Sequence, residues 1–142
     1  MSNSQFFHIF DFDGVLFDFR KTWKLFPNTI QILKNLKQKG YRIALASKRQ
    51  ANSSFSEQIL NVLRENNIHD LFDGIYIADQ TKVTHILTMQ NNLEKKYGTS
   101  LKPILYDDDE QNIKECSSAG YITVHINTHE GIKESDIIKE DS

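Results

Sequence analysis

The sequence predicts an α/β protein in which a five-stranded parallel sheet lies between two layers of helices. Three observations predict this class. Short apolar segments alternate with longer segments of helical spacing along the 142 residues. The first apolar segment, Phe6–Phe10, is interrupted only by His8, as expected for a strand that is covered on both faces. Finally, Gly40, Gly98 and Gly120 stand where helical segments should end.

Five segments have the length and composition of buried strands. Pro103 opens the fourth of them, at a position where its missing N–H donor matters least. Strands that are separated by helices imply right-handed crossover connections and a parallel sheet. The expected strands are Phe6–Phe10, Tyr41–Ser47, Gly74–Ala78, Pro103–Asp107 and Tyr121–Ile126.

Four segments have helical spacing. The first follows Pro27 and places Ile30, Leu33 and Leu36 on one face. The second has a serine as its candidate N-cap, and the third and fourth are followed by glycines. The expected helices are Asn28–Lys39, a segment from Ser53 or Ser54 to Asn66, Thr81–Tyr97 and Asp109–Ala119.

Length and composition indicate one globular domain, which we place at residues 1–126, followed by a polar tail at 127–142. The net charge of −2 gives no general attraction to nucleic acid or to an anionic membrane. Cys116 is the only cysteine, which excludes an intramolecular disulfide. No stretch approaches the roughly 20 apolar residues of a membrane span, and the N-terminus does not resemble a signal peptide. We therefore expect a cytoplasmic protein, and the sequence indicates no oligomeric state.

Polar and charged residues stand where the expected strands end and where the third helix begins. In parallel α/β sheets, ligands bind outside the carboxyl ends of the strands, so these residues form a candidate site. They are Asp11, Asp13, Ser47, Lys48, Lys82, Asp107 and Asp108.

The chemistry of this set favours a cation and a phosphate ester. Carboxylates gathered at one edge repel one another unless a cation neutralises them. Hard oxygen ligands suit Mg²⁺, which commonly binds one or two carboxylates together with a substrate phosphate. A phosphate monoester is itself an anion, so Mg²⁺ and Lys82 would supply the positive charge that lets it bind. One carboxylate could then attack phosphorus.

Four short motifs occur in order along the chain: "DFDGV" after the first strand, "ALAS" at the end of the second, a lysine that opens the third helix, and "ILYDDDEQNI". Together they resemble the four motifs of haloacid-dehalogenase-like phosphatases, over residues 6–126. The resemblance is greatest to the small magnesium-dependent phosphatases. It implies a Rossmann-like, haloacid-dehalogenase-like fold and hydrolysis through an aspartyl-phosphate intermediate.

The resemblance also implies a role for each matching residue. Asp11 would be the nucleophile and a metal ligand. Asp13 would protonate the leaving oxygen, then deprotonate the attacking water, and its main-chain carbonyl would bind the metal. Asp108, with Asp107 beside it, would complete the metal site; adjacent strand residues point in opposite directions, so one of the two is expected to bind directly, with Asp108 favoured.

Three further residues would bind the phosphoryl group. Ser47 would donate a hydrogen bond to it, together with the main-chain N–H groups of Phe12 and Lys48. Lys82 would pair with both the phosphoryl group and Asp11. In the small magnesium-dependent phosphatases an arginine commonly follows the serine and a bulky residue commonly follows the second aspartate, where this chain has Lys48 and Gly14. Lysine lacks the planar fork of arginine, so the substrate preference of those relatives is not carried over.

Many relatives carry a cap domain, but the gaps at 18–40 and 47–82 are too short to hold one. An uncapped site suits a phosphoprotein, although a phosphorylated sugar or metabolite also fits. Two alternatives remain: a polynucleotide end phosphatase, which the net charge disfavours, and a catalytically silent phosphate-binding module on the same fold.

Some features have two interpretations. The aromatic segment Phe17–Phe26 either packs on the sheet or forms a wall for the leaving group, and Asp18 is either a substrate contact or surface. His85 is expected to be structural, although it lies one helical turn after Lys82. Cys116 is expected to be a buried apolar residue.

Overall fold

A five-stranded parallel sheet forms the centre of the protein, as the sequence predicts. The computed structural model describes residues 5–48 and 53–139. The strand order is β5-β4-β1-β6-β7, so the first strand of the sheet in sequence lies in its middle. Its strands are β1 (Gln5–Phe10), β4 (Arg42–Ser47), β5 (Gly74–Ile77), β6 (Leu101–Asp107) and β7 (Ile122–His125).

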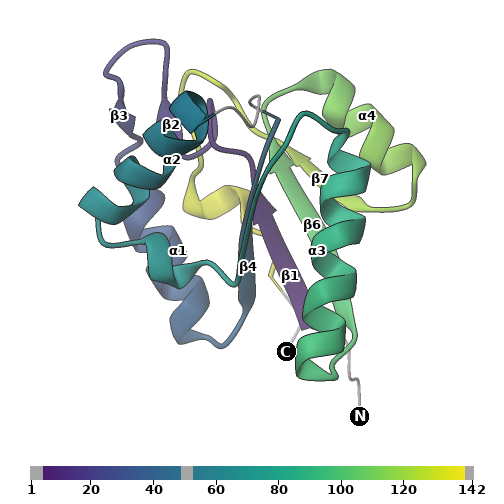
Figure 1. Ribbon diagram of the computed structural model, residues 1–142. Helices are drawn as coiled ribbons and strands as arrows, with labels where there is room; N and C mark the ends of the chain where they lie inside the picture. The colour runs from purple at the N-terminus through teal and green to yellow at the C-terminus, as the bar shows by residue number, and fades with distance from the viewer. Residues whose placement is uncertain (1–4, 49–52, 140–142) are drawn as a thin grey trace.

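Four helices cover the two faces of the sheet. In Figure 1, α1 and α2 lie on one side and α3 and α4 on the other, which gives the three layers expected from alternating strands and helices. Each boundary falls within two residues of its expected position. The helices are α1 (Thr29–Gln38), α2 (Ser53–Glu65), α3 (Lys82–Tyr97) and α4 (Glu110–Ser118).

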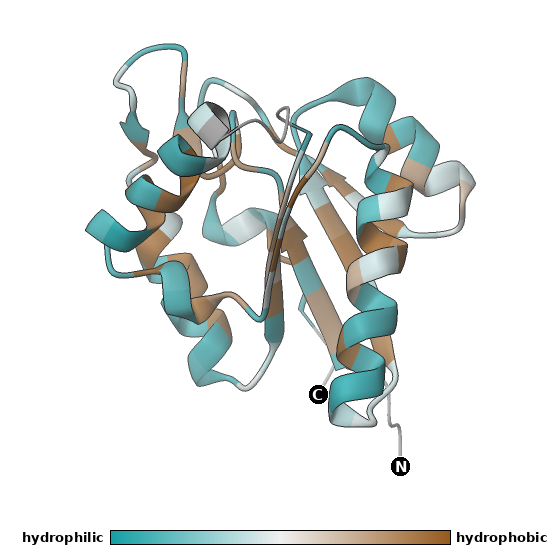
Figure 2. Cartoon of the chain, viewed as in Figure 1, coloured by the Kyte–Doolittle hydropathy of each residue, from teal (hydrophilic) through white to brown (hydrophobic). Residues whose placement is uncertain are grey.

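Each layer of helices has its own apolar core against the sheet, and Figure 2 shows the hydrophobic residues gathered in the strands and on the inner faces of the helices. Leu33 of α1 and Leu63 of α2 are fully buried on one side. Ile86 of α3 and Cys116 of α4 are fully buried on the other, so Cys116 is a core residue as expected. A sheet covered on both faces explains why its strands are largely apolar.

A small hairpin between β1 and α1 was not predicted. Its antiparallel strands, β2 (Phe17–Asp18) and β3 (Lys24–Leu25), have two residues each. The Asp18 carboxylate accepts hydrogen bonds from the backbone N–H groups of Arg20, Lys21 and Thr22, and thereby shapes the loop between the strands. Among the described residues, this hairpin and a short 3₁₀-helix at His69–Leu71 were not expected, and a second short 3₁₀-helix lies at Glu134–Asp136.

Residues 127–139, which the sequence analysis set apart as a polar tail, pack against the core of the domain. Ile132 is fully buried and Ile137 nearly so, both in the core that α1 and α2 cover. The backbone N–H of Ile132 donates to the carbonyl of Val15, and that of Ile138 donates to the Tyr106 hydroxyl. Isolated isoleucines in a charged segment give no periodic pattern, which is why sequence reasoning overlooked this contact.

No cap domain is inserted within residues 5–48 and 53–139; the hairpin is the largest feature added between β1 and α1. In the same ranges, none of the helices combines the length and apolar character that crossing a bilayer requires.

Candidate active site

The register of the central strands brings the predicted site residues to one edge of the sheet. Phe10 of β1 pairs with Leu45 of β4 and with Tyr106 of β6. Asp11 and Asp107 therefore reach the carboxyl edge side by side, and Ser47 ends the neighbouring strand. A cavity of about 590 Å³ opens at this edge. Its described lining residues are Asp11, Asp13, Phe19, Arg20, Ser47, Lys48, Lys82, Asp108, Asp109, Glu110, Gln111 and Asn112.

Lys82 joins two of the carboxylates beneath the cavity. Its Nζ lies 3.0 Å from Asp11 Oδ1 and 2.7 Å from Asp107 Oδ2. The Lys82 and Asp107 side chains are fully buried, and that of Asp11 is 14% exposed. Burial lowers the pKa of Lys82, but the Asp11 and Asp107 carboxylates raise it by more than burial lowers it. The net result is a pKa of about 12. Lys82 is therefore an ammonium ion at the first position of α3, where two carboxylates offset the unfavourable helix dipole.

Asp107 and Asp108 have different surroundings although they are adjacent. Both oxygens of Asp107 accept hydrogen bonds: Oδ2 from Lys82 and from the Asn112 side chain, and Oδ1 from the backbone N–H of Asp109. The Asp108 side chain is on the cavity wall and hydrogen-bonds Thr128. Asp107 is the last residue of β6, whereas Asp108 lies just beyond the end of the strand.

The carboxylates of Asp11, Asp107 and Asp108 are crowded. Each offers an oxygen that lies within 4.8 Å of an oxygen of the other two. Burial raises the pKa of Asp11 well above its ordinary value, Lys82 opposes this, and the charges of Asp107 and Asp108 raise it further. Burial also raises the pKa of Asp108. Such a set of hard oxygen donors fits a divalent cation, which would relieve the repulsion among them.

A tight turn after Asp11 makes room for this cluster. The Phe12 carbonyl accepts hydrogen bonds from the N–H groups of Leu16 and Phe17, and Gly14 adopts a left-handed φ of +82°. A Cβ at Gly14 would overlap the Asp108 carboxylate and would lie 2.7 Å from Thr128 Oγ1. Glycine is therefore required here both for its backbone conformation and for the close approach of Asp108.

Lys48 and Asn112 connect the end of β4 to α4. The Lys48 Nζ donates to Asn112 Oδ1 at 3.2 Å, and Asn112 Nδ2 donates to Asp107 Oδ2 at 3.1 Å. Asp109 caps α4 by accepting from the N–H groups of Gln111 and Asn112, which fixes the first turn of the helix beside the cavity. Ser47 is almost fully buried at the cavity floor.

The predicted residues that follow β1 occupy different positions. Asp13 is half-buried and lines the cavity. The Phe12 ring is buried and stacks on Phe17, so only its main chain can face a ligand. The structure thus gathers Asp11, Asp13, Ser47, Lys48, Lys82 and Asp108 around one cavity and places Asp107 directly beneath it.

Three residues near the cavity were missed by sequence reasoning. Arg20 comes from the hairpin and lines the cavity, Asn112 holds Asp107, and Thr128 contacts Asp108. Asn112 lies within the quoted "DDDEQNI" segment, so its nearness to the site could have been inferred. No sequence pattern marks Arg20 or Thr128, because their approach depends on how the hairpin and the C-terminal segment pack.

Other uncertain residues have structural surroundings. His85 is buried and its Nε2 lies 2.9 Å from the Ala78 carbonyl, and burial lowers its pKa to about 4. Asp18 organises the hairpin loop. Of the aromatic segment, Phe17 and Phe26 are buried, whereas Trp23 is 61% exposed. Phe17 and Phe26 therefore pack as core residues, whereas Phe19 lines the cavity, which is the position that the second interpretation requires.

Comparison with known families agrees with this geometry. Residues 7–140 match the acid phosphatase family. The chain belongs to this family. It is therefore a phosphatase of the haloacid-dehalogenase-like class and a hydrolase, as the four motifs predicted. The acid phosphatase match also extends past Ile126 into the segment that packs on the core.

Two solved structures are similar to this acid phosphatase family member in fold. A hydrolase from Streptococcus pneumoniae TIGR4 has a TM-score of 0.57 and 16% identity, covering 82% of this chain and 90% of that one. Protein Tyrosine Kinase A (PtkA) of Mycobacterium tuberculosis has a TM-score of 0.51 and 19% identity, covering 84% of this chain and 53% of that one. This chain thus spans about half the length of PtkA. Curated protein sequences gave no match. At such identities the two structures establish a shared fold.

Proposed function

We propose that this phosphatase is a Mg²⁺-dependent phosphomonoesterase that works through a phosphoaspartate at Asp11. The observation that carries the proposal is the pair of contacts from Lys82 Nζ to Asp11 and to Asp107. Burial raises the pKa of Asp11, whereas the ammonium of Lys82, 3.0 Å away, opposes this rise, as a bound cation also would. Both positive charges favour the ionised carboxylate of Asp11. It can therefore act as a nucleophile beneath an open cavity.

The proposed reaction has two steps. Asp11 attacks phosphorus, the bond from phosphorus to the leaving oxygen breaks, and Asp13 gives that oxygen a proton. Asp13 then removes a proton from a water molecule, which attacks the phosphorus of the aspartyl-phosphate. Inorganic phosphate leaves, and both carboxyl groups return to their starting states. Ser47, Lys48 and Lys82 would bind the phosphoryl oxygens during both steps.

The residues present fit a magnesium ion. Asp11 and Asp108 offer hard carboxylate oxygens, and the main-chain carbonyl of Asp13 would be a third ligand. Asp107 is proposed to stay outside the inner set of ligands, because both of its oxygens already accept hydrogen bonds. When bound, the ion would offset the charge of the carboxylates and of the transferring phosphoryl group.

The substrate is proposed to be a phosphoprotein or a phosphorylated sugar or metabolite. The open cavity and the absence of a cap in the described ranges support a leaving group that extends into solvent. A cytoplasmic location is likewise a proposal.

Hydrolysis of p-nitrophenyl phosphate tests the activity. We expect turnover with Mg²⁺, loss of turnover with EDTA and recovery when Mg²⁺ is restored. Asp11→Asn should lower kcat by roughly 10³-fold or more, because it removes the nucleophile. Asp70→Asn is the matched control, since the Asp70 side chain is fully exposed. Full activity of Asp11→Asn would refute the proposed nucleophile.

Trapping tests the intermediate directly. Borohydride reduces an acyl phosphate to the alcohol, so reduction during turnover should convert Asp11 to homoserine, which mass spectrometry detects. Asp13→Asn should accumulate more of this product, because the water that hydrolyses the intermediate loses its base. Modification at another carboxylate, or none in an active enzyme, would contradict the mechanism.

A further inference from the structure

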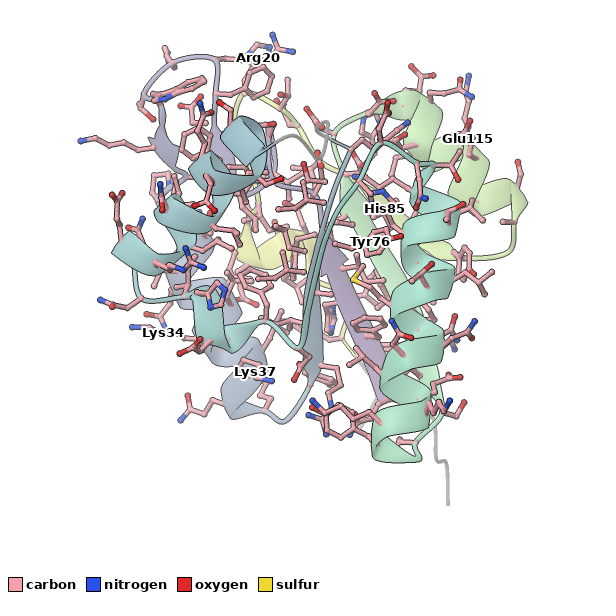
Figure 3. The ribbon with its side chains drawn as sticks, in the orientation of Figure 1. Arg20, Lys34, Lys37, Tyr76, His85 and Glu115 are labelled. Atoms are coloured by element: carbon pink, nitrogen blue, oxygen red, sulfur yellow. The ribbon has the colours of Figure 1, made fainter. Side chains whose placement is uncertain are left out.

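Arg20 is presented to the cavity by an ordered loop. It lies in the loop of the β2–β3 hairpin, and Figure 3 shows its side chain at the same end of the molecule as the carboxyl ends of the strands. The Asp18 carboxylate accepts from the backbone N–H of Arg20 and of the two residues that follow. The backbone N–H of Trp23 donates to the Asp18 carbonyl at 2.8 Å and closes the loop. The position of Arg20 is therefore fixed by its own loop.

The guanidinium group is held on two sides by uncharged partners. It lies over the ring of Phe19, 4.7 Å from the centroid, and its Nε donates to Thr128 Oγ1 at 3.2 Å. Within residues 5–48 and 53–139, no hydrogen bond or ion pair involves its two Nη atoms. The Nη edge of a guanidinium can donate two parallel hydrogen bonds to a carboxylate or a phosphate.

The other basic residues of the described cavity wall already have roles. Lys82 is paired with Asp11 and Asp107, and Lys48 donates to Asn112 at the end of β4 beside Ser47. Both therefore belong to the side of the cavity that is proposed to bind the phosphoryl group. Arg20 comes from the hairpin, a separate element, and no carboxylate of the described residues neutralises it.

The acidic residues at the rim do not cancel this charge. Asp109 accepts from two backbone N–H groups at the start of α4, so it is stabilised by the helix. Glu110 lies 3.4 Å from Lys114 in an exposed pair along the same helix. Among the described residues no carboxylate pairs directly with Arg20, and the Asp108 carboxylate is linked to it only through Thr128. Arg20 therefore offers a charged donor edge from the hairpin to the group that is attached to the phosphoryl group.

We propose that Arg20 is a specificity-determining residue that binds a second anionic group, a carboxylate or a phosphate, on the leaving group of the substrate. This inference rests on the proposed phosphomonoesterase function and narrows its substrate class. Phe19 and Thr128 orient the guanidinium so that its Nη edge meets the second anion. A substrate with a neutral leaving group binds without that contact.

Matched substrate pairs test the inference. In 3-phosphoglycerate a carboxylate replaces a hydroxymethyl group of glycerol 3-phosphate, and 6-phosphogluconate differs from glucitol 6-phosphate in the same way over a longer reach. We expect kcat/KM to be about tenfold higher for the anionic member of at least one pair, mainly because its KM is lower. A bidentate contact between a guanidinium and an anion is stronger than a single exposed ion pair, which supports an effect of this size. Arg20→Gln should bring that ratio close to one, and Arg20→Lys should restore part of it.

Arg64→Gln is the matched control, because Arg64 is exposed on α2 and does not line the cavity. It should leave the ratio unchanged. The inference is overturned if neither pair shows a preference, or if Arg20→Gln lowers kcat/KM equally for both members, which would place Arg20 on the phosphoryl group. Failure of the wild-type protein to hydrolyse p-nitrophenyl phosphate would instead refute the proposed function.

Discussion

Lys82 and Asp107 form an ion pair in which both side chains are fully buried, with 2.7 Å between Nζ and Oδ2. An ion pair in such a place is costly to break, because the remaining partner keeps its charge without compensation. It also holds the ammonium of Lys82 in place beside Asp11. Stability and proposed catalysis therefore depend on the same contact.

Replacement of Lys82 by methionine should reduce both properties. The side chain keeps its approximate size, but Asp11 and Asp107 lose their shared cation. We expect the free energy of unfolding, measured by urea denaturation, to fall by about 3–5 kcal/mol, and aryl phosphate hydrolysis to be lost. Lys133→Met is the control, since Lys133 forms an exposed pair with Glu130 and should affect neither measurement strongly. An active, fully stable Lys82→Met protein would contradict this role.

Asp107 and Asp108 should respond differently to the loss of charge. Asp108→Asn is expected to weaken the apparent affinity for Mg²⁺ more than Asp107→Asn does, because Asp108 is the proposed direct ligand. Loss of an outer partner typically costs 10- to 100-fold in metal affinity. Asp107→Asn should instead cost stability, since it leaves Lys82 with one carboxylate. Titration of activity with Mg²⁺ and urea denaturation of both variants separate the effect on metal affinity from the effect on stability. If Asp107→Asn weakened the Mg²⁺ affinity more than Asp108→Asn did, Asp107 would be the direct ligand instead of Asp108.

Gly14→Ala should impair the proposed metal site through the backbone. A left-handed φ costs a non-glycine residue about 1–2 kcal/mol, and the new Cβ would displace the Asp108 carboxylate. We expect lower stability and a higher Mg²⁺ requirement. Gly40→Ala is the matched control, because Gly40 has a φ of +88° but open space around it. It should lose comparable stability while its Mg²⁺ requirement stays at the wild-type level. Equal Mg²⁺ requirements in both variants would argue that the close approach of the Asp108 carboxylate to Gly14 does not matter for the proposed metal site.

Acidification should destabilise the protein through His8. This histidine is fully buried in β1, with Nδ1 2.8 Å from the Tyr106 hydroxyl, and burial lowers its pKa from 6.5 to about 4. Between these values the unfolded chain binds a proton at His8 that the folded chain does not, so acid favours unfolding across this window. Below about pH 4 both states are protonated and the effect is complete.

Urea denaturation between pH 7 and pH 4 measures this dependence. His8 should contribute up to about 1.4 kcal/mol per pH unit to the slope of the free energy of unfolding. His8→Gln should have a shallower slope, with the contribution of His85 remaining. His129→Gln, at an exposed position, should keep the wild-type slope. An unchanged slope in His8→Gln would show that His8 takes up its proton at the same pH in the folded and the unfolded chain.

The sheet and its helices could be predicted because both faces of the sheet are covered. Burial on two sides makes β1, β4 and β6 nearly continuous apolar runs, and glycines mark where α3 and α4 end. The site followed from the same logic, since carboxyl ends of parallel strands meet at one edge.

What the sequence did not predict lies where packing decides local structure. The hairpin strands have two residues each, too few for a periodic pattern, and the turn between them depends on how Asp18 folds back on its own loop. The buried positions of Ile132 and Ile137 depend on a surface that α1 and the sheet create together. Arg20 and Thr128 meet across 108 positions of sequence, and neither has a motif that points to the other.

The central place of β1 in the sheet affects how this protein is made. β1 is the first strand of the sheet to leave the ribosome, and β4 can pair with one of its edges soon afterwards. The other edge waits for β6, which begins only at Leu101. During this interval a bare strand edge is available to other nascent chains, which favours aggregation. Asp107 ends the same late strand and Asp108 follows it, so a prematurely terminated chain would carry the proposed nucleophile, Asp11, without the proposed metal ligand, Asp108.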